Sequence, residues 1–201
     1  EDGPTHEPVE QEAQIRLMEK LHNHSGRPSV MVLRPADAEE TTAAWKMAME
    51  NIYTPTALIL SRQDVTSVPN TSAEGVKKGA YIVSQDENPQ VVMLASGSEV
   101  STLMAGAELL RAEGIRLQIV SVPSEAIFRQ QSKEYQAEVL PQGVLRFGLT
   151  AGLPCNLEGL VGEHGTIWGF NSFGFSAPYK VLDEKLGFTA QNVYDQVKKL
   201  L

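Results

Sequence analysis

Asp2 and His6 are two residues near the start of the chain whose types and spacing could do chemistry. They lie four positions apart in the polar segment Glu-Asp-Gly-Pro-Thr-His-Glu-Pro, residues 1–8. A Gly3-Pro4 turn between them can hold a carboxylate and an imidazole toward one point, which suits proton transfer and hydroxyl recognition. The alternative is a frayed polar terminus, because terminal residues are usually poorly ordered. We interpret the segment as an active-site loop that belongs to a longer protein.

Arg62 is the third candidate, because it ends a segment that has the pattern of a buried strand. Residues 55–62 are apolar at their centre and finish in the polar pair Ser61-Arg62. Open α/β sheets place ligand contacts at the carboxyl ends of their strands, and a planar guanidinium suits a phosphate or a carboxylate. The alternative is a salt bridge to a neighbouring carboxylate such as Asp64.

A weaker signal is Ser96-Gly-Ser-Glu99, which follows one expected strand and opens a helix. Backbone N–H groups and the helix dipole could bind an anion at such a place. However, neither a G-x-G-x-x-G sequence nor a P-loop lysine is present, and Glu99 would repel a phosphate. Structural capping is therefore the favoured interpretation, with an anion site as the alternative.

The remaining histidines and the cysteine are better explained without chemistry. His22 and His24 lie in a polar loop without the carboxylate or cysteine partners of a metal cage, so a solvated loop is favoured. His164 lies in a glycine-rich stretch that indicates a turn, with a pocket lining as the alternative. Cys155 follows Pro154 without a plausible base at a known spacing, so a structural thiol is favoured over a nucleophile.

Composition excludes several classes of protein. The chain has 201 residues, a net charge of −8 and a single cysteine. The acidic balance opposes binding of a nucleic-acid backbone, and no apolar run is long enough to span a bilayer. One cysteine excludes an internal disulfide, which fits a reducing cytoplasm. We expect no nucleic-acid or membrane partner.

Short strands that alternate with helices indicate an α/β fold with helices on a mostly parallel sheet. Residues 66–78 are rich in Ser, Thr, Asn, Pro and Gly, so we expect a linker between a part at residues 1–65 and a domain at residues 79–201. In the first part we expect a helix at 9–20, a strand at 29–33, a helix from Asp37 to about Glu50 with a capping box formed with Glu40, and a strand at 55–62. In the second part we expect a hairpin of strands 80–84 and 90–95, followed by a helix at 100–113 that Gly114 stops. A strand at 115–122, a helix from Pro123 to about Ala137 and a strand at 144–149 should follow. The chain should then continue through an irregular aromatic and glycine-rich stretch at 167–178 and end in a helix at 189–201 capped by Thr189.

Six segments, taken together and in order, resemble transketolase from one end of the chain to the other. Single segments have little specificity, apart from the opening loop and the strand that ends in Ser-Arg-Gln. The segments are Glu-Asp-Gly-Pro-Thr-His-Glu-Pro (1–8), Arg-Pro-Ala-Asp (34–37), Pro-Thr-Ala-Leu-Ile-Leu-Ser-Arg-Gln (55–63), Ala-Ser-Gly-Ser-Glu-Val (95–100), Val-Ser-Val-Pro-Ser (120–124) and Phe-Gly-Phe-Ser-Ala-Pro (173–178).

The resemblance implies a thiamine-diphosphate enzyme of the pentose phosphate pathway that moves a two-carbon ketol unit between sugar phosphates. It implies that His6 contacts the donor substrate and helps with proton movements, that Asp2 recognises a sugar hydroxyl, and that Arg62 binds the substrate phosphate. Residues 1–65 would be a truncated remnant of the pyrimidine-binding domain. Residues 79–201 would be the C-terminal domain, with three layers and a mostly parallel sheet.

The resemblance also implies parts that this sequence does not contain. The diphosphate-binding domain with its Gly-Asp-Gly metal motif is absent, as is the glutamate that activates the cofactor. We therefore expect thiamine diphosphate and Mg²⁺ in the full-length homodimer, no cofactor-binding or metal-binding residue in this segment, and no activity from the segment alone.

Three other readings compete. Deoxyxylulose-phosphate synthase and the β subunit of 2-oxo-acid dehydrogenases share the domain order, but the opening loop and Leu-Ser-Arg-Gln at residues 60–63 favour transketolase. The chain could instead be a non-catalytic binding or interaction module that kept the fold. A nicotinamide-dependent oxidoreductase would need a glycine-rich dinucleotide turn that the sequence lacks.

Overall fold

The strand β4 (Val91–Ala95) shows why the larger part of the molecule has three layers. The computed structural model describes residues 2–201, and in it all five residues of β4 are buried. Val91 and Met93 belong to the apolar cluster on one face of the sheet, whereas Val92 and Leu94 belong to the cluster on the other face. A strand covered on both faces needs no polar alternation. The expected α/β fold with a mostly parallel sheet is confirmed.

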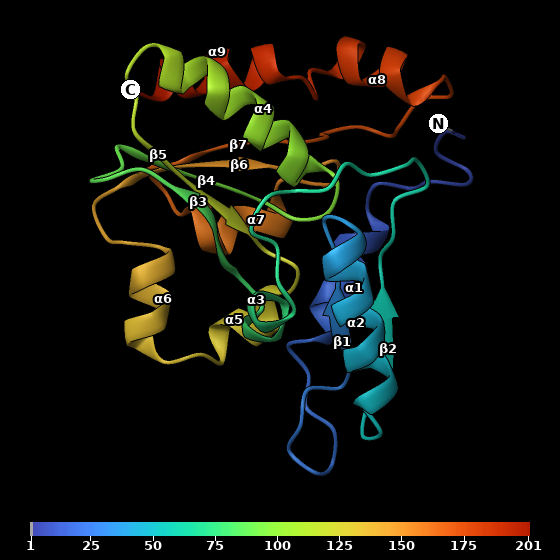
Figure 1. Cartoon of the computed structure of the whole chain (residues 1–201). Helices are drawn as coiled ribbons and strands as arrows, with labels where there is room; N and C mark the ends of the chain where they lie inside the picture. Colours follow the sequence, from blue (N-terminus) through green and yellow to red (C-terminus); the bar gives the residue numbers. More distant parts are fainter. Residues whose placement is uncertain (1) are drawn as a thin grey trace.

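The sheet has five strands in the order β3-β5-β4-β6-β7, and only the edge strand β3 is antiparallel to its neighbour. Helices α4 and α9 pack on one face with α8 beside them, and α5, α6 and α7 lie on the other face (Figure 1). The bounds are β3 (Tyr81–Gln85), α4 (Glu99–Ala112), β5 (Leu117–Ser121), α5 (Glu125–Arg129), α6 (Lys133–Val139), β6 (Leu145–Leu149), α7 (Cys155–Val161), β7 (Thr166–Trp168), α8 (Tyr179–Leu186) and α9 (Ala190–Leu200).

The smaller part is built on two parallel strands, β1 (Met31–Leu33) and β2 (Thr56–Leu58), with helices α1 (Gln11–Met18) and α2 (Ala38–Glu50). Helix α2 begins as expected, because the Asp37 carboxylate accepts a hydrogen bond from Glu40 N at 3.0 Å. The Glu40 carboxylate reaches back to Ala36 N, at 2.7 Å, one residue before the position of a regular capping box. This part packs directly against the larger one, since its apolar residues join the same core cluster.

Two expectations about strands are wrong. The strand at 55–62 is reduced to the three residues of β2, which are half-buried because β1 is its neighbour in a sheet of two strands. The hairpin of 80–84 with 90–95 does not form, since β3 pairs with β5 in the register Tyr81↔Ser121. Both edges of β4 are already taken by β5 and β6, and Asp86 N and its carboxylate bind the backbone of Leu117 instead of closing a turn.

The stretch expected as a linker is not wholly irregular, because it ends in helix α3 (Ala73–Lys78). Ser72 Oγ caps this helix by accepting from Gly75 N at 3.1 Å, and Val76 is completely buried. Gly79 then ends the helix with a φ of +82°, a conformation that favours glycine.

Several helices differ from the expectation, and others have no counterpart in it. The helix expected at 123–137 is two short helices, α5 and α6, because Ser132 starts a new helix by accepting from Tyr135 N. Helices α7 and α8 were not expected. The aromatic stretch was expected to be irregular, but its first residues form β7, where the Trp168 indole N–H donates to Leu186 O at 3.0 Å.

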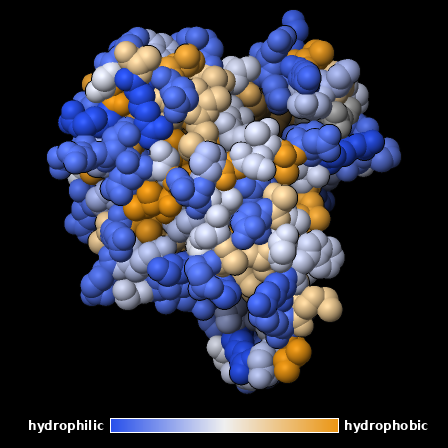
Figure 2. All heavy atoms as spheres, viewed as in Figure 1, coloured by the Kyte–Doolittle hydropathy of each residue, from blue (hydrophilic) through white to orange (hydrophobic). Residues whose placement is uncertain are grey.

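The face of the molecule seen in the view of Figure 1 is mostly polar. On the face shown in Figure 2, hydrophilic residues predominate and apolar residues form small separate patches. In the described part of the chain, none of the helices combines the length and the apolar character that a membrane crossing requires.

Candidate active-site loop and the cleft behind it

The opening loop is a defined turn that rests on the aromatic and glycine-rich stretch. Gly3 O accepts hydrogen bonds from His6 N at 3.2 Å and from Glu7 N at 2.9 Å. Asp2 pairs with Ser176 in an isolated antiparallel bridge. Gly3 has a φ of +82°, and a Cβ on it would collide with the Ser176 hydroxyl, so the turn requires glycine for both reasons. The frayed-terminus alternative does not hold for residues 2–7.

The structure brings two of the three candidate residues together. Arg62 Nη1 forms a charged hydrogen bond with Asp2 Oδ2, between residues sixty positions apart. The salt bridge that was the alternative for Arg62 therefore forms, with Asp2 as a partner where Asp64 was the example. The Arg62 side chain is 60% exposed and that of Asp2 39%, so solvent screens the pair and leaves the guanidinium accessible.

His6 lies in the same turn and is exposed. Its Nδ1 atom is 2.8 Å from Thr5 Oγ1, a contact that fixes the ring against its neighbour. The loop thus carries an imidazole, a carboxylate and, through the Asp2 contact, a guanidinium at one end of the molecule. Such a set can exchange protons, accept hydroxyl hydrogens and bind a phosphate.

A cleft of ≈ 510 Å³ lies behind the loop, between the smaller part and the C-terminal sheet. Gly3 and Glu7 line it from the loop, Arg62 from the segment after β2, and Ser98 from the start of α4. The segment from Phe170 to Phe188 closes another side. The cleft therefore joins the candidate loop to the carboxyl edge of the parallel sheet, where α/β folds bind ligands.

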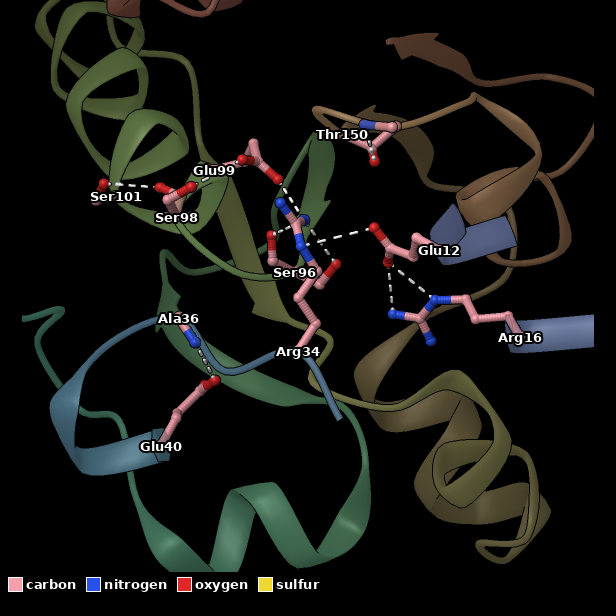
Figure 3. Close-up of polar contacts among 11 residues, drawn as sticks. Glu12, Arg16, Arg34, Ala36, Glu40, Ser96, Ser98, Glu99, Ser101 and Thr150 are labelled. Atoms are coloured by element: carbon pink, nitrogen blue, oxygen red, sulfur yellow. Dashed lines mark hydrogen bonds and ion pairs between the residues drawn. The ribbon is translucent and has the colours of Figure 1, made fainter. Parts of the chain in front are cut away.

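Arg34 lies at the floor of this cleft in a buried ionic cluster (Figure 3). Its Nη1 atom bonds to the Glu99 carboxylate and donates to Ser96 O at 2.7 Å, and its Nε lies 3.6 Å from Glu12 Oε2. Arg16 binds the other side of Glu12, with Nε 2.9 Å from Oε1. Sequence reasoning missed this cluster. The available signal was the charged residue directly after the expected strand at 29–33, the same placement that identified Arg62.

The cluster determines the charges at this place. Burial alone would raise the pKa of Glu12, but Arg34 and Arg16 outweigh it and the net pKa is lowered. For Arg34, burial alone would lower the pKa, because it disfavours the charged form. The carboxylates of Glu99 and Glu12 outweigh this effect and raise the pKa, so the guanidinium stays charged. Glu19 lies 4.0 Å from Arg16 and behaves differently, because burial raises its pKa to about 7.

The weaker candidates have structural roles or lie in ordinary loops. Ser98 precedes α4 without a side-chain cap hydrogen bond, so the favoured capping interpretation is not confirmed, and Ser96 and Glu99 instead bind the Arg34 guanidinium. His22 and His24 are exposed residues of the loop between α1 and β1, and His164 lies in a turn, as expected. Cys155 begins α7 and is exposed, so it is not a buried structural thiol. Among residues 2–201, no three His, Cys, Asp or Glu side chains gather as a metal site would require.

Two family models match the chain. The model described as the transketolase-like C-terminal domain matches residues 79–189, and the model described as the transketolase pyrimidine-binding domain matches residues 1–67. The transketolase of Geobacillus stearothermophilus is 44% identical over 207 aligned positions, which cover 100% of this chain and 30% of that protein. The chain thus spans about a third of the length of the curated relatives it matches.

Solved structures agree with this assignment. Transketolase from Leishmania mexicana superposes with a TM-score of 0.90 at 39% identity, covering 100% of this chain and 28% of that one. A Pichia stipitis transketolase in complex with sedoheptulose 7-phosphate gives 0.88 at 33% identity, with 100% and 28% covered. A split-gene transketolase, described as an inactive β4 tetramer, gives 0.73 at 25% identity, with 96% of this chain and 62% of that chain covered.

Proposed function

The chain belongs to the transketolase family, and we propose that it contributes substrate contacts to a complete enzyme that transfers a two-carbon ketol unit between sugar phosphates. The substrates are inferred from the family and from the relative bound to sedoheptulose 7-phosphate. The observation that carries the proposal is the meeting of Asp2 and Arg62, from distant parts of the sequence, beside the turn that holds His6.

Each of these residues has a role that its chemistry and exposure support. The exposed Arg62 guanidinium would bind the substrate phosphate, since a planar fork of N–H donors matches phosphate oxygens. Asp2, which holds Arg62 in the absence of substrate, would accept a hydrogen bond from a sugar hydroxyl. His6 would exchange protons with substrate hydroxyls near neutral pH.

Thiamine diphosphate, when bound to the complete enzyme, supplies the carbon nucleophile that accepts the ketol unit. We propose, from the family resemblance, that the residues that hold Mg²⁺ and the diphosphate of the cofactor lie outside residues 1–201. The residues of this chain would then orient the sugar phosphate, hold its phosphate at Arg62 and move protons at His6.

The proposal extends to assembly and location. Trp45, Met49, Ile52 and Tyr53, on or just after α2, are between 51% and 79% exposed, as expected where a sheet of only two strands is incomplete. We infer that the rest of the pyrimidine-binding domain covers them in a homodimeric cytoplasmic enzyme. The segment alone would be inactive, as is the described tetramer of the split-gene relative.

The first test uses Arg62 variants of the complete protein, assayed for ketol transfer from xylulose 5-phosphate to ribose 5-phosphate with thiamine diphosphate and Mg²⁺. Loss of a charged hydrogen bond to phosphate costs about 3 kcal/mol, so Arg62→Ala should lower kcat/KM for xylulose 5-phosphate by about 100-fold. Xylulose without a phosphate should be affected far less. The same loss for both donors would show that Arg62 does not bind the phosphate.

Arg116→Ala is the matched control, because Arg116 is exposed, donates to Asn88 O at 3.0 Å and does not line the cleft. The competing proposal is a non-catalytic binding module with the same fold. It would replace the enzyme proposal if the complete wild-type protein showed no thiamine-diphosphate-dependent ketol transfer. Mixing the 201-residue chain with the remaining polypeptide should restore activity that neither piece has alone.

A further inference from the structure

Arg34 links the two parts of the molecule, because it comes directly after β1 yet lies inside the crevice at the carboxyl edge of the C-terminal sheet. Its backbone is held on both sides there. Arg34 N donates to Pro123 O, after β5, at 2.9 Å, and Gly97 N, after β4, donates to Arg34 O at 3.2 Å. The residue is docked between two strand ends of a sheet to which it does not belong.

The side chain fills the position that a ligand occupies in many α/β sheets. The guanidinium bonds to the Glu99 carboxylate, to Ser96 O at 2.7 Å and to Ser96 Oγ at 3.3 Å. Gly97 makes this close approach possible, since a Cβ at that position would lie 2.8 Å from Arg34 Cζ. These three contacts are all made by Nη1, whereas Nε faces Glu12, so a lysine, with a single ammonium group, could not contact both carboxylates in this way.

The same guanidinium also holds the helix that follows the candidate loop. Arg34 Nε lies 3.6 Å from Glu12 Oε2, and Glu12 is the one buried residue of α1. Helix α1 has only eight residues and no side-chain cap at its start. An isolated helix of this length is unstable in water, so its position depends on tertiary contacts, and the ion pair of Glu12 with Arg34 is the one made by its buried residue.

We propose that Arg34 is a positioning residue, bound by the C-terminal sheet as an internal ligand, which fixes α1 and thereby the loop that carries Asp2 and His6. The connection is short, because His6 precedes Glu12 by six residues and the turn between Gly3 and Glu7 is closed by backbone hydrogen bonds. The C-terminal domain would then take part in substrate binding without touching the substrate. The expected effect on kcat/KM rests on the proposed function, whereas the expected effect on the position of the loop does not.

The test removes the guanidinium and then supplies it from solution. Arg34→Ala in the complete protein keeps both backbone hydrogen bonds and leaves a cavity lined by the Glu99 and Glu12 carboxylates. Hydrogen exchange of residues 3–12 should become faster, while exchange of β4 stays unchanged. Since misplacement of a catalytic loop by about 1 Å can cost 100-fold, kcat/KM for xylulose 5-phosphate should fall by about that factor. The half-saturating concentration of thiamine diphosphate should stay unchanged.

Millimolar guanidinium should restore both the exchange protection and kcat/KM of Arg34→Ala, whereas urea, which has the same shape without the charge, should restore neither. Arg34→Lys should behave like Arg34→Ala. Glu12→Gln, which keeps the side-chain shape, should give the same losses to a smaller degree, and it provides the test if Arg34→Ala does not fold. Arg111→Ala removes a comparable ion pair with Asp86 inside the C-terminal domain and should leave the loop unaffected.

Two results would overturn the inference: unchanged exchange of residues 3–12 in both Arg34→Ala and Glu12→Gln, or equal restoration by urea and guanidinium. If the wild-type protein lacks ketol transfer, the proposed function fails. The exchange measurements would still decide whether Arg34 positions the loop.

Discussion

Arg34 and Arg62 carry the same guanidinium group, but their surroundings give them different capacities. The Arg34 side chain is 11% exposed and lies between two carboxylates, so its hydrogen-bonding capacity is used within the protein. The Arg62 side chain is 60% exposed, and an exposed pair such as that with Asp2 contributes only about 0 to 1 kcal/mol. A phosphate dianion can therefore replace the Asp2 carboxylate at little cost. The exposed Arg62 is therefore suited to binding a substrate, whereas the buried Arg34 is suited to stabilising the structure.

Glu19 offers a test of residue-scale electrostatics through the pH dependence of stability. Its pKa is raised from 4.5 to about 7, chiefly by burial. The unfolded chain loses this proton first as pH rises, so stability falls between pH 4.5 and about 7 and the loss is constant above that range. Glu19→Gln keeps an oxygen to accept the hydrogen bond from Val32 N. The variant should match the wild type near pH 4.5 and exceed it by about 3 kcal/mol above pH 7.

The measurement is urea unfolding of both proteins at several pH values between 4 and 8. Glu74→Gln is the control, because the Glu74 side chain is 80% exposed and solvent screens its pair with Lys77, so its replacement should change the pH profile far less. An equal stability difference at every pH would mean that Glu19 does not titrate in this range.

Local sequence proposed candidate residues in loops but did not reveal the buried ionic cluster. Asp2, His6 and Arg62 stand beside a turn or a strand end, where their neighbours in the sequence mark them as candidates, and their roles stay predictions. Arg34 depends on Glu99, 65 residues away, and on its approach to Gly97. Whether a charged residue is buried depends on such distant partners, and local pattern does not contain them.

At the scale of elements, the failed hairpin shows the same limit. Strands 80–84 and 90–95 have a turn sequence between them, which favours pairing of neighbours. In the structure, β5 lies between β3 and β4. The strand β4 therefore has the parallel neighbours β5 and β6 on its two edges, and all of its residues are buried. The helix after Ser98, the stop near Gly114 and the Thr189 cap were predicted correctly, since capping and glycine conformation are local.

The contact between α4 and α9 gives a prediction at this scale. Gly106 faces α9, and a Cβ on it would lie 2.7 Å from Val193 Cβ. Alanine would gain about 1 kcal/mol of helix propensity, but overpacking costs about 1 to 3 kcal/mol. Gly106→Ala should therefore lower the free energy of unfolding by about 1 kcal/mol, measured by urea denaturation.

Val193→Ala should be destabilising by itself, because Val193 is completely buried and its removal leaves a cavity. The double variant Gly106→Ala, Val193→Ala should be somewhat more stable than the sum of the two single losses predicts, since Val193→Ala removes the Cγ1 atom that would lie 2.5 Å from the new methyl group, although the Cβ atom at 2.7 Å stays. Additive losses would show that the two helices adjust without contact between these positions.

At the scale of the whole molecule, a buried polar joint and a shared core hold the two parts together. Glu40 on α2 is completely buried and accepts hydrogen bonds from Tyr81 OH at 2.7 Å and Ser121 Oγ at 2.6 Å, both in the C-terminal sheet. Asp37 accepts from Val68 N at 2.9 Å and Thr71 Oγ1 at 2.8 Å, which fixes the segment between the parts. This arrangement explains why an expected linker is largely ordered, and it predicts that both parts unfold together.

The chain has two tryptophans, one in each part: Trp45 on α2 and Trp168 on β7. Single-tryptophan forms, made with Trp45→Phe or Trp168→Phe, allow each part to be followed by fluorescence during thermal unfolding. With Glu40 intact, the two transitions should coincide.

Glu40→Ala leaves three buried donors without an acceptor, at about 1 to 3 kcal/mol each, so the Trp45 transition should shift to lower temperature and separate from that of Trp168. Glu74→Ala, at an exposed position on α3, should move neither. If Glu40→Ala lowered both transitions equally, Glu40 would stabilise the molecule without acting as the joint, and the shared apolar core alone would couple the two parts.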